Sequence, residues 1–305
     1  MVDPRAEWQP TACPLCNEIR SVRLMRFDPD VSTVAVPKGT RGLNLVRCST
    51  CSLVYLDFAP TSDAMARIYG SEGYFGQDAA TGYADYEMQK DTLSLTFARF
   101  LNTLHLRTGC AGSLADIGCG SGLLLDQARS WFSLRVGADM SSTAADLSPA
   151  VCDGAVTGGP RQILSAGYAG FDVVTAVSVL EHVYNPVDFI RECGALLKPG
   201  GFLVGVVPDF GGLWRKSMGR HWTSFKIPEH LTFWERHTLT YLGDRAGMET
   251  IGFIPYDHCF PLSVILNRLG IRISTPGEVG RYRVWLPRVM TAVIYSRPDR
   301  EQEGA

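Results

Sequence analysis

Residues 114–122 read LADIGCGSG, and this stretch decides how the chain folds. Residues 113–117 predict a buried strand, and residues 123–130 predict the helix that follows it. The three glycines between them, Gly118, Gly120 and Gly122, lack a Cβ and let a ligand approach the backbone closely. Their G-x-G-x-G spacing differs from the G-x-G-x-x-G of dinucleotide-binding turns, which favours a nucleoside without a pyrophosphate.

Asp139 is the acidic partner of this turn. It follows the second predicted strand, residues 134–138, and lies 22 positions after Ile117. A carboxylate at the end of that strand can accept hydrogen bonds from both hydroxyls of a ribose. The turn and the acid together are more specific than either feature alone.

Strands and helices alternate through the rest of the chain. Strands are predicted at residues 171–177 and 202–207, and a helix that begins at Pro186 and ends at Leu197 lies between them. A further helix at residues 238–246 precedes late strands at 250–256 and 288–296. This alternation predicts an α/β fold with parallel strands and helices on both faces of the sheet.

Four segments, in chain order, resemble class I S-adenosylmethionine-dependent methyltransferases. They are LADIGCGSG at 114–122, FDVV at 171–174, VLEHV at 179–183 and LLKPGG at 196–201. The likeness extends over residues 84–296. It implies a Rossmann-like sheet of seven strands, with S-adenosylmethionine as cofactor and S-adenosylhomocysteine as product.

The resemblance also implies roles for single residues. Asp116 and the glycine turn would face the methionine and ribose portions of the cofactor, and Asp139 would bind the ribose hydroxyls. Met140 would flank the adenine. Ser178, at the start of the loop after the fourth strand, would also line the cofactor site.

Two parts of the cofactor site are less well defined by the resemblance. Tyr74 and Tyr83 would form a lid over the methionine moiety, or they would pack the N-terminal helix. Many relatives place an acid after strand three to bind the adenine amino group. Residues 154–158 read GAVTG and offer no such acid.

Four cysteines form two C-x-x-C pairs, Cys13 with Cys16 and Cys48 with Cys51. Extended segments between the pairs predict a hairpin that can bring the four thiolates together. Such a set suits tetrahedral zinc and leaves no open coordination position, so the metal would be structural. A redox pair or unligated thiols are the alternatives.

This arrangement resembles the zinc-ribbon head of some bacterial methyltransferases, including deoxysugar C-methyltransferases. It implies three parts: a zinc-ribbon module over residues 1–58, a helical connector and lid over 59–108, and a methyltransferase domain over 109–300. The domain would carry a substrate loop at about residues 209–236, in which aromatic, basic and acidic side chains alternate.

Two histidines are candidates for the general base that removes a proton from the acceptor. His182 follows the fourth strand, at the sheet edge where the methyl group should lie. Its alternative role is to hold the loop and the cofactor. His230 lies in the substrate loop, and its alternative role is to cap a helix or to pair with Glu229.

The segment PEHL at 228–231, with Phe233 after it, resembles a signature of ubiquinone-type O-methyltransferases and zinc-headed sugar C-methyltransferases. In the sugar enzymes a catalytic tyrosine precedes the histidine by three positions. This chain has Ile227 there, which disfavours sugar C-methylation and leaves His230 as the leading general base.

Composition limits the acceptor. The formal net charge of −2 and the pI near 6.3 give no overall attraction for a polyanion. Residues 178–181 read SVLE, not the N/D-P-P-aromatic tetrapeptide of base-modifying enzymes. We therefore expect a small-molecule acceptor from natural-product or other secondary metabolism, with oxygen slightly favoured over carbon or nitrogen, and expect nucleic acid not to be a partner.

Two alternatives stay open. Basic residues of the N-terminal module would suit a zinc-headed RNA methyltransferase: Arg20, Arg23, Arg26, Lys38, Arg41 and Arg47. The second alternative is a protein that binds the cofactor but does not transfer the methyl group.

No signal-peptide or membrane-spanning pattern is visible in the sequence. The chain has nine cysteines, and this odd number indicates a reducing compartment. We therefore expect a cytoplasmic location.

Overall fold

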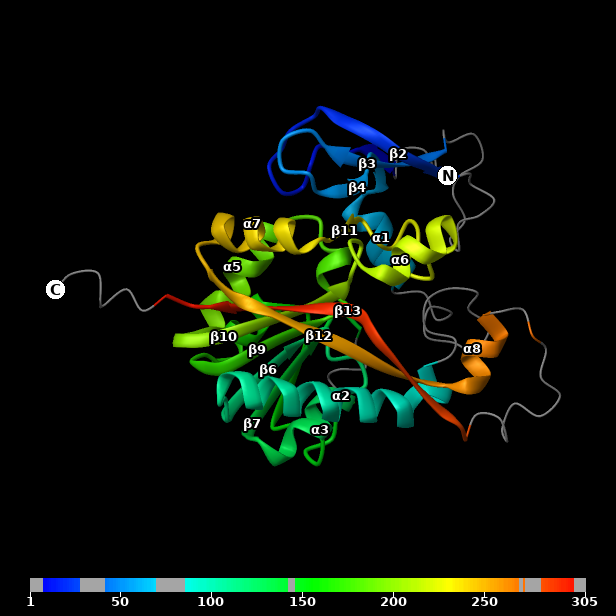
Figure 1. Ribbon diagram of the computed structural model, residues 1–305. Helices are drawn as coiled ribbons and strands as arrows, with labels where there is room; N and C mark the ends of the chain where they lie inside the picture. Colours follow the sequence, from blue (N-terminus) through cyan, green and yellow to red (C-terminus); the bar gives the residue numbers. More distant parts are fainter. Residues whose placement is uncertain are drawn as a thin grey trace.

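A seven-stranded sheet forms the centre of the computed structural model, which describes residues 8–27, 42–69, 86–141, 146–268, 271 and 281–298. In sheet order the strands are β12 Glu249–Pro261, β13 Arg283–Ser296, β10 Leu197–Pro208, β9 Phe171–Val177, β6 Gly112–Ile117, β7 Phe132–Asp139 and β8 Gly154–Thr157. From β10 to β8 all neighbours pair in parallel, whereas β13 is antiparallel to both of its neighbours (Figure 1). The predicted α/β fold with a Rossmann-like sheet is confirmed.

The strand order reverses between β6 and β9. From β6 the chain moves outward through β7 and β8, and it then returns to β9 on the opposite side of β6. Open α/β sheets bind ligands beyond the carboxyl ends of their strands at such a reversal. The glycine turn follows β6 and Asp139 ends β7, so both predicted cofactor elements lie at this edge.

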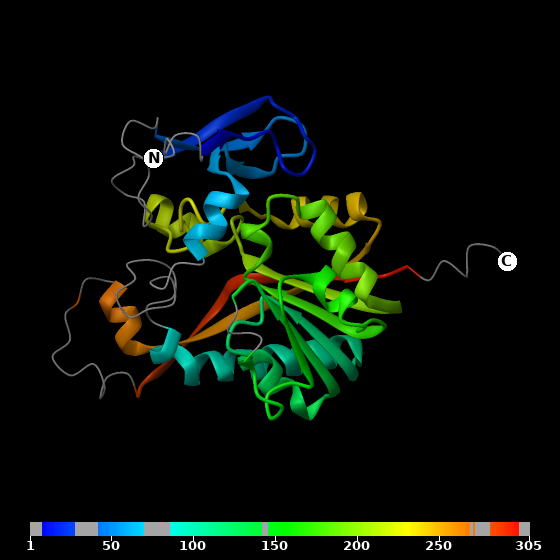
Figure 2. The ribbon, with the colours of Figure 1, turned by 180° about the vertical axis from the view of Figure 1, so that it is seen from behind.

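Helices cover both faces of the sheet, which is why its central strands are apolar on both sides. On one face, α2 (Tyr86–Thr108) and α3 (Leu123–Gln127) pack with Leu114 and Val173. On the other, α4 (Pro160–Ser165), α5 (Pro186–Leu196) and α7 (Arg236–Ala246) pack with Ala115 and Val174 (Figures 1 and 2). None of the described helices has the length and apolar character needed to cross a membrane.

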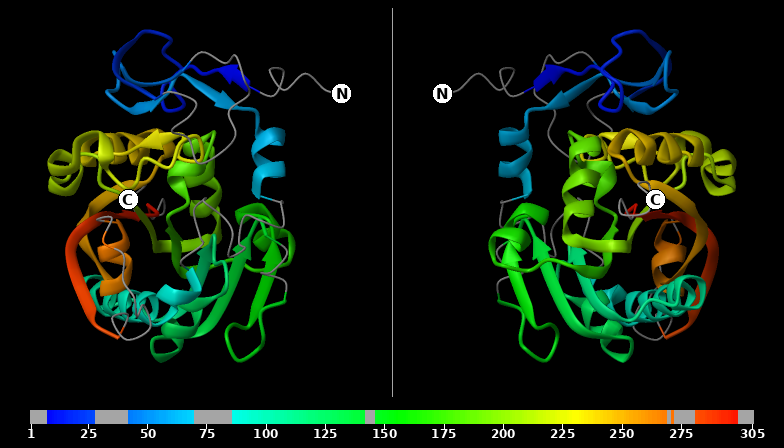
Figure 3. Two further views of the ribbon diagram at one scale, coloured as in Figure 1. Left: turned by 90° about the vertical axis from the view of Figure 1, so that its right-hand side faces the viewer. Right: turned by 90° about the vertical axis from the view of Figure 1, so that its left-hand side faces the viewer.

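The N-terminal region forms a second sheet on the side of α5 and α7 (Figure 3). Its strands are β2 Ser21–Phe27, β3 Leu43–Cys48, β4 Val54–Leu56 and β11 Thr232–Phe233, in the order β11-β4-β3-β2. The hairpin expected between the cysteine pairs is present. The fourth strand was not expected, because it comes from the predicted substrate loop nearly 180 residues later.

The module and the substrate loop also share one apolar core. Leu45 and Leu56 of the module cluster with Phe210, Trp222 and Phe233 of the loop. The Arg47 guanidinium donates a 2.7 Å hydrogen bond to Glu235, the residue that caps the start of α7. The predicted boundary at residue 58 therefore does not separate two independent hydrophobic cores.

The remaining short elements connect these layers. They are β1 Trp8–Pro10, which pairs with β5 Phe58–Pro60, and the helices α1 Ser62–Tyr69, α6 Leu213–Met218 and α8 Leu262–Arg268. Strands β12 and β13 are both longer than their sequence pattern predicted. Their extra residues pair with each other beyond the end of β10, and such non-local pairing has no local sequence signal.

Candidate active site

The glycine turn has the backbone conformation that explains its composition. Gly118, Gly120 and Gly122 have φ values of 77°, 49° and 76°, a left-handed region that side chains with a Cβ rarely adopt. A Cβ at Gly118 would collide with the Val179 side chain, and one at Gly122 would lie 2.6 Å from Val151. Among the described residues, no atom beyond Gly120 and its chain neighbours lies within 4 Å of its Cβ position, so Gly120 leaves space that a cofactor can occupy.

Asp139 is held against this turn. Its Oδ2 accepts a 2.9 Å hydrogen bond from the Gly120 amide, and its Oδ1 accepts one of 2.8 Å from the Ser141 amide. Each carboxylate oxygen keeps a second lone pair for a ligand hydroxyl. The next side chain, Met140, is 72% exposed, so its thioether is free to pack on an aromatic ring of a ligand. The geometry suits the predicted ribose and adenine roles, which stay predictions.

Asp116 lies beneath the turn and is buried. Its Oδ1 accepts a 2.7 Å hydrogen bond from the Thr175 hydroxyl in the neighbouring strand β9. Burial away from water disfavours the carboxylate and raises the pKa of Asp116 to about 7. Asp116 thus joins the two strands that support the turn.

Replacing Asp116 with asparagine is expected to flatten the pH dependence of stability. The folded chain holds this proton up to about pH 7, whereas an unfolded carboxyl of ordinary pKa 3.8 releases it. The contribution to stability is therefore complete below about pH 4 and is lost as the pH rises to about 7, by up to ~1.4 kcal/mol per pH unit. Asparagine keeps the oxygen that binds Thr175 and does not ionise. Urea unfolding of the wild type and the variant between about pH 5 and about pH 8 measures how the free energy of unfolding of each depends on pH. An equal loss of stability in the two proteins as the pH rises would show that Asp116 is ionised in the folded chain.

The loop after β9 closes onto the glycine turn. Ser178 adopts φ 56°, a strained value for a residue other than glycine, and its amide donates a 2.9 Å hydrogen bond to the Val206 carbonyl. Val179 follows it and packs against Gly118. Ser178 is thus placed beside the predicted cofactor space, while Tyr74 and Tyr83 lie outside the described residues. Residues 154–158 form β8 and the end of that strand without an acid.

His182 and His230 come together although 47 residues separate them. Their rings are in edge-to-face contact, with centroids 4.7 Å apart. The two segments are joined by the Leu231 amide, which donates a 2.8 Å hydrogen bond to the Glu181 carbonyl. The structure therefore unites the two predicted catalytic histidines in one cluster at the start of the loop after β9.

Burial favours the neutral form of both imidazoles in this cluster. His230 is 5% exposed, and loss of hydration lowers its pKa well below the usual range. Desolvation likewise lowers the pKa of the half-buried His182 to about 3. In the part of the chain that the structure describes, the Nδ1 atom of His230 has no hydrogen-bond partner, so that nitrogen does not pair with Glu229.

Glu181 is the third member of this cluster, and the sequence analysis missed it. Glu181 is 1% exposed, and neither of its carboxyl oxygens has a hydrogen-bond partner among the described residues. Burial raises its pKa to about 8. A signal was present in the sequence, because Glu181 directly precedes His182 in the VLEHV segment, but the pattern does not show that the carboxyl group is buried.

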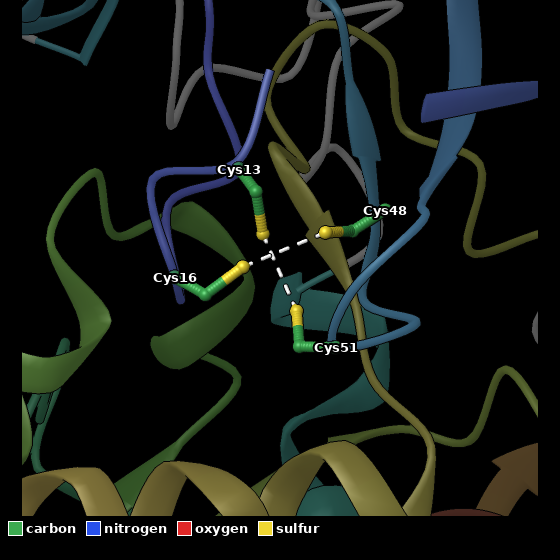
Figure 4. Close-up of side chains that lie close together, drawn as sticks. All are labelled: Cys13, Cys16, Cys48 and Cys51. Carbon is green, nitrogen blue, oxygen red and sulfur yellow. Dashed lines mark hydrogen bonds between the residues drawn. The ribbon is translucent and has the colours of Figure 1, made fainter. Parts of the chain in front are cut away.

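The four N-terminal cysteines converge from two turns (Figure 4). The sulfurs of Cys13 and Cys51 are 3.4 Å apart, those of Cys16 and Cys48 are 3.5 Å apart, and all four lie within 4.8 Å of one another. Tetrahedral zinc with Zn–S bonds of about 2.3 Å needs sulfurs separated by about 3.8 Å, so the cluster fits this metal. A hydrogen bond from Cys51 lowers the pKa of Cys13 to about 5, which favours thiolate. All nine cysteines are free of disulfides.

A family model described as a methyltransferase domain matches residues 88–251, which is more than half of the chain. The chain belongs to this methyltransferase family. The cofactor edge of the sheet and the Glu181 cluster both lie inside the matched region, whereas the four cysteines lie outside it.

Named relatives of this methyltransferase include enzymes of ubiquinone biosynthesis. It is 31% identical over 181 residues to a ubiquinone biosynthesis O-methyltransferase of Methylococcus capsulatus, covering 52% of this chain and 75% of the relative. Another from Xanthomonas oryzae is 30% identical over 176 residues, covering 48% and 71%. A 1,6-didemethyltoxoflavin-N1-methyltransferase structure from Burkholderia thailandensis has 15% identity and a TM-score of 0.49, covering 87% of this chain and 98% of that one. The protein is an S-adenosylmethionine-dependent methyltransferase.

The basic residues that left an RNA acceptor open are partly neutralised. Arg20 pairs with Glu18 at 3.0 Å, and Arg47 pairs with Glu235 at 2.7 Å. Lys38 and Arg41 lie outside the described residues. The described part of the module thus offers less free positive charge than its sequence indicated.

Proposed function

We propose that this methyltransferase transfers the methyl group of S-adenosylmethionine to a hydroxyl oxygen of a small molecule, in natural-product or other secondary metabolism. The observation that carries the proposal is the contact between Val179 and Gly118. Val179 lies two residues before Glu181, so this contact supports an acceptor-side cluster of Glu181, His182 and His230 near the sheet edge that carries the glycine turn. The relatives named as O-methyltransferases support oxygen as the acceptor atom.

Asp139 and the glycine turn would hold the cofactor. The cofactor supplies an activated methyl group on sulfur, so the chain has to align the acceptor and assist loss of its proton. Gly120 leaves room beside its backbone, and Asp139 offers two oriented carboxylate oxygens. The acceptor would approach from the side of the substrate loop, where His230 lies.

We also propose that Cys13, Cys16, Cys48 and Cys51 hold a structural zinc ion. Four thiolates would fill all coordination positions, so this metal would stabilise the module and take no part in methyl transfer. Because the module shares its core with the substrate loop, the zinc would also stabilise the loop that carries His230.

The test is turnover with a panel of small hydroxylated acceptors, including phenols, followed as S-adenosylhomocysteine formation. His230→Gln is expected to lower kcat by about 100-fold or more, the usual size of an acid–base contribution. Binding of S-adenosylhomocysteine, measured by calorimetry, should stay unchanged. The control is His237→Gln, an exposed histidine on α7. Full activity of the His230 variant would exclude an acceptor-side role, and methylation of RNA but no small molecule would contradict the proposed acceptor.

A further inference from the structure

We propose that Arg215 binds an anionic group of the acceptor, a carboxylate or a phosphate, and so holds the acceptor hydroxyl at the site of methyl transfer. Arg215 lies on α6, in the predicted substrate loop. The inference rests on the proposed function and adds an acceptor class to it, a small hydroxylated molecule that carries a negative charge.

The substrate loop is locally cationic although the chain as a whole is slightly acidic. Residues 210–228 contain four lysines and arginines and no aspartate or glutamate, whereas the formal net charge of the chain is −2. Lys226 brings this positive charge to the acceptor-side cluster, because it acts electrostatically on Glu181 and on both histidines. A run of positive charge beside a reaction site raises the local concentration of anionic ligands.

The contacts of Arg215 leave its hydrogen-bonding groups without a partner. Its guanidinium carbon lies 4.6 Å from the ring centroid of Phe210 and 5.9 Å from that of Phe225. Among the described residues, its buried Nε has no hydrogen-bond partner, and no carboxylate pairs with the guanidinium. Stacking uses the faces of the guanidinium plane, whereas the N–H donors point outward within that plane. The ring contacts therefore fix the orientation of the guanidinium and leave its donors available to a ligand.

The free donors of Arg215 suit a ligand with two negatively charged oxygens. A guanidinium binds a carboxylate or a phosphate through two parallel hydrogen bonds, and one that is already stacked on aromatic rings loses little freedom when it does so. A buried donor without a partner is unfavourable, and one oxygen of such a ligand would accept a hydrogen bond from Nε. A neutral amide would bind less well, because the stronger hydrogen bonds join opposite charges.

Strand register places α6 at the sheet edge where methyl transfer would occur. Strand β13 is antiparallel to β10 and pairs Met290 with Pro208, the last residue of β10. Residues before Met290 therefore continue beyond the carboxyl end of β10. One of them is Pro287, whose carbonyl accepts a 2.8 Å hydrogen bond from Nε1 of Trp214. Trp214 precedes Arg215 on α6, so this hydrogen bond holds the helix beyond the cofactor edge, between the N-terminal sheet and α8 (Figure 1).

A row of aromatic rings joins Arg215 to the predicted general base His230. The ring centroid of Phe225, on which Arg215 stacks, lies 5.5 Å from that of Phe233. The centroid of Phe233 lies in turn 6.3 Å from that of His230. Phe225 is only partly buried, so its ring can pack on an apolar part of a ligand. An acceptor would thus be held at its anionic end by Arg215 and would present its hydroxyl to His230.

The experiment is calorimetric binding of matched acceptor analogues in the presence of saturating S-adenosylhomocysteine, so that no turnover is needed. The probes are a dihydroxybenzoate, the dihydroxybenzamide with the same ring, and a hydroxyphenyl phosphate. The wild type should bind one or both anions more tightly than the amide, by about 10-fold or more. Arg215→Gln should weaken binding of the preferred anion by about 10- to 100-fold and leave binding of the amide unchanged. Arg215→Lys keeps the charge but not the planar fork, so it should restore only part of the affinity.

The matched control is Arg220→Gln, which removes an exposed positive charge from the same loop. Solvent and salt screen such a charge, so the affinity for the anion should change by no more than about 2-fold. Equal weakening by the Arg215 and Arg220 variants would reveal a general charge effect and overturn the site. Equal binding of both anions and the amide by the wild type would also overturn it. A purely structural role of Arg215 would lower the affinity for anion and amide alike. Unchanged binding of S-adenosylhomocysteine verifies that each variant is folded.

Turnover separates the anion site from the proposed function. Selective binding of the anion that is lost in Arg215→Gln, without formation of S-adenosylhomocysteine from any hydroxylated acceptor, would contradict O-methylation and support the site. Turnover that prefers neutral acceptors and is unchanged in Arg215→Gln would overturn the site and leave O-methylation standing.

Discussion

Replacing Asp139 with alanine is expected to weaken the binding of S-adenosylmethionine by about 100-fold. Hydrogen bonds to a charged group contribute about 1.5–3 kcal/mol each, and a ribose would make two of them. A total loss of about 3 kcal/mol corresponds to this change in Kd. The carboxylate also orients the turn through the Gly120 and Ser141 amides, so its removal loosens the backbone that faces the cofactor.

Isothermal calorimetry with S-adenosylhomocysteine measures this effect without turnover. The matched control is Asp153→Ala, because Asp153 accepts a 2.8 Å hydrogen bond from the Arg135 amide near the other end of β7. Its loss removes a comparable carboxylate that is hydrogen-bonded to the same strand but lies away from the cofactor edge. An unchanged Kd for the Asp139 variant, or an equal change in the control, would remove Asp139 from the ribose site.

Replacing Cys48 with serine is expected to abolish zinc binding and to lower the free energy of unfolding of the module by several kcal/mol. Structural zinc contributes about 10–16 kcal/mol of binding free energy in small zinc domains, so losing even a part of this free energy has a large effect on stability. The damage should extend to the substrate loop, because β11 pairs with β4 and the two segments share a core. Limited proteolysis should therefore cut the loop around Trp222 as well as the module.

Metal analysis and thermal unfolding test this prediction, with Cys193→Ser as the control. Cys193 is equally buried, on α5, but belongs to no cysteine cluster among the described residues. Its replacement should cost only about 1–3 kcal/mol for burying a hydroxyl and should leave the zinc in place. Freshly purified wild-type protein without zinc would contradict the assignment, as would a Cys48 variant that retains the metal.

The central fold was predictable because its signals are local. The strand at residues 171–177 was predicted with the bounds that β9 has, and the helix beginning at Pro186 ends one residue earlier than expected. Each element has a local sequence signal: an apolar run for the strand and a proline at the first position of the helix. The prediction of where α3 ends was less accurate, because the helix changes to a 3-10 helix at Ala128.

The candidate site was predictable only in part. Its donor side depends on a turn and an acid at the ends of adjacent parallel strands, and a parallel sheet places such ends together. Its acceptor side depends on burial. His182 was selected from the sequence as a titratable residue at a sheet edge and His230 as one in the predicted substrate loop, but their contact and the burial of Glu181 beside them depend on the folded chain.

The sequence by itself determined the α/β class, the position of the cofactor turn and the presence of two cysteine pairs, because each follows from spacing along one or two neighbouring segments. Only the tertiary structure decided that residues 232–233 complete the N-terminal sheet and that a buried carboxyl group lies beside two imidazoles. Both results depend on contacts between distant segments and on exclusion of water. Neither strand pairing across nearly 180 residues nor desolvation of a side chain has a local sequence pattern. Residues 114–122 therefore indicate the methyl donor, whereas under the proposed function the folded loops around His230 would determine how an acceptor is activated.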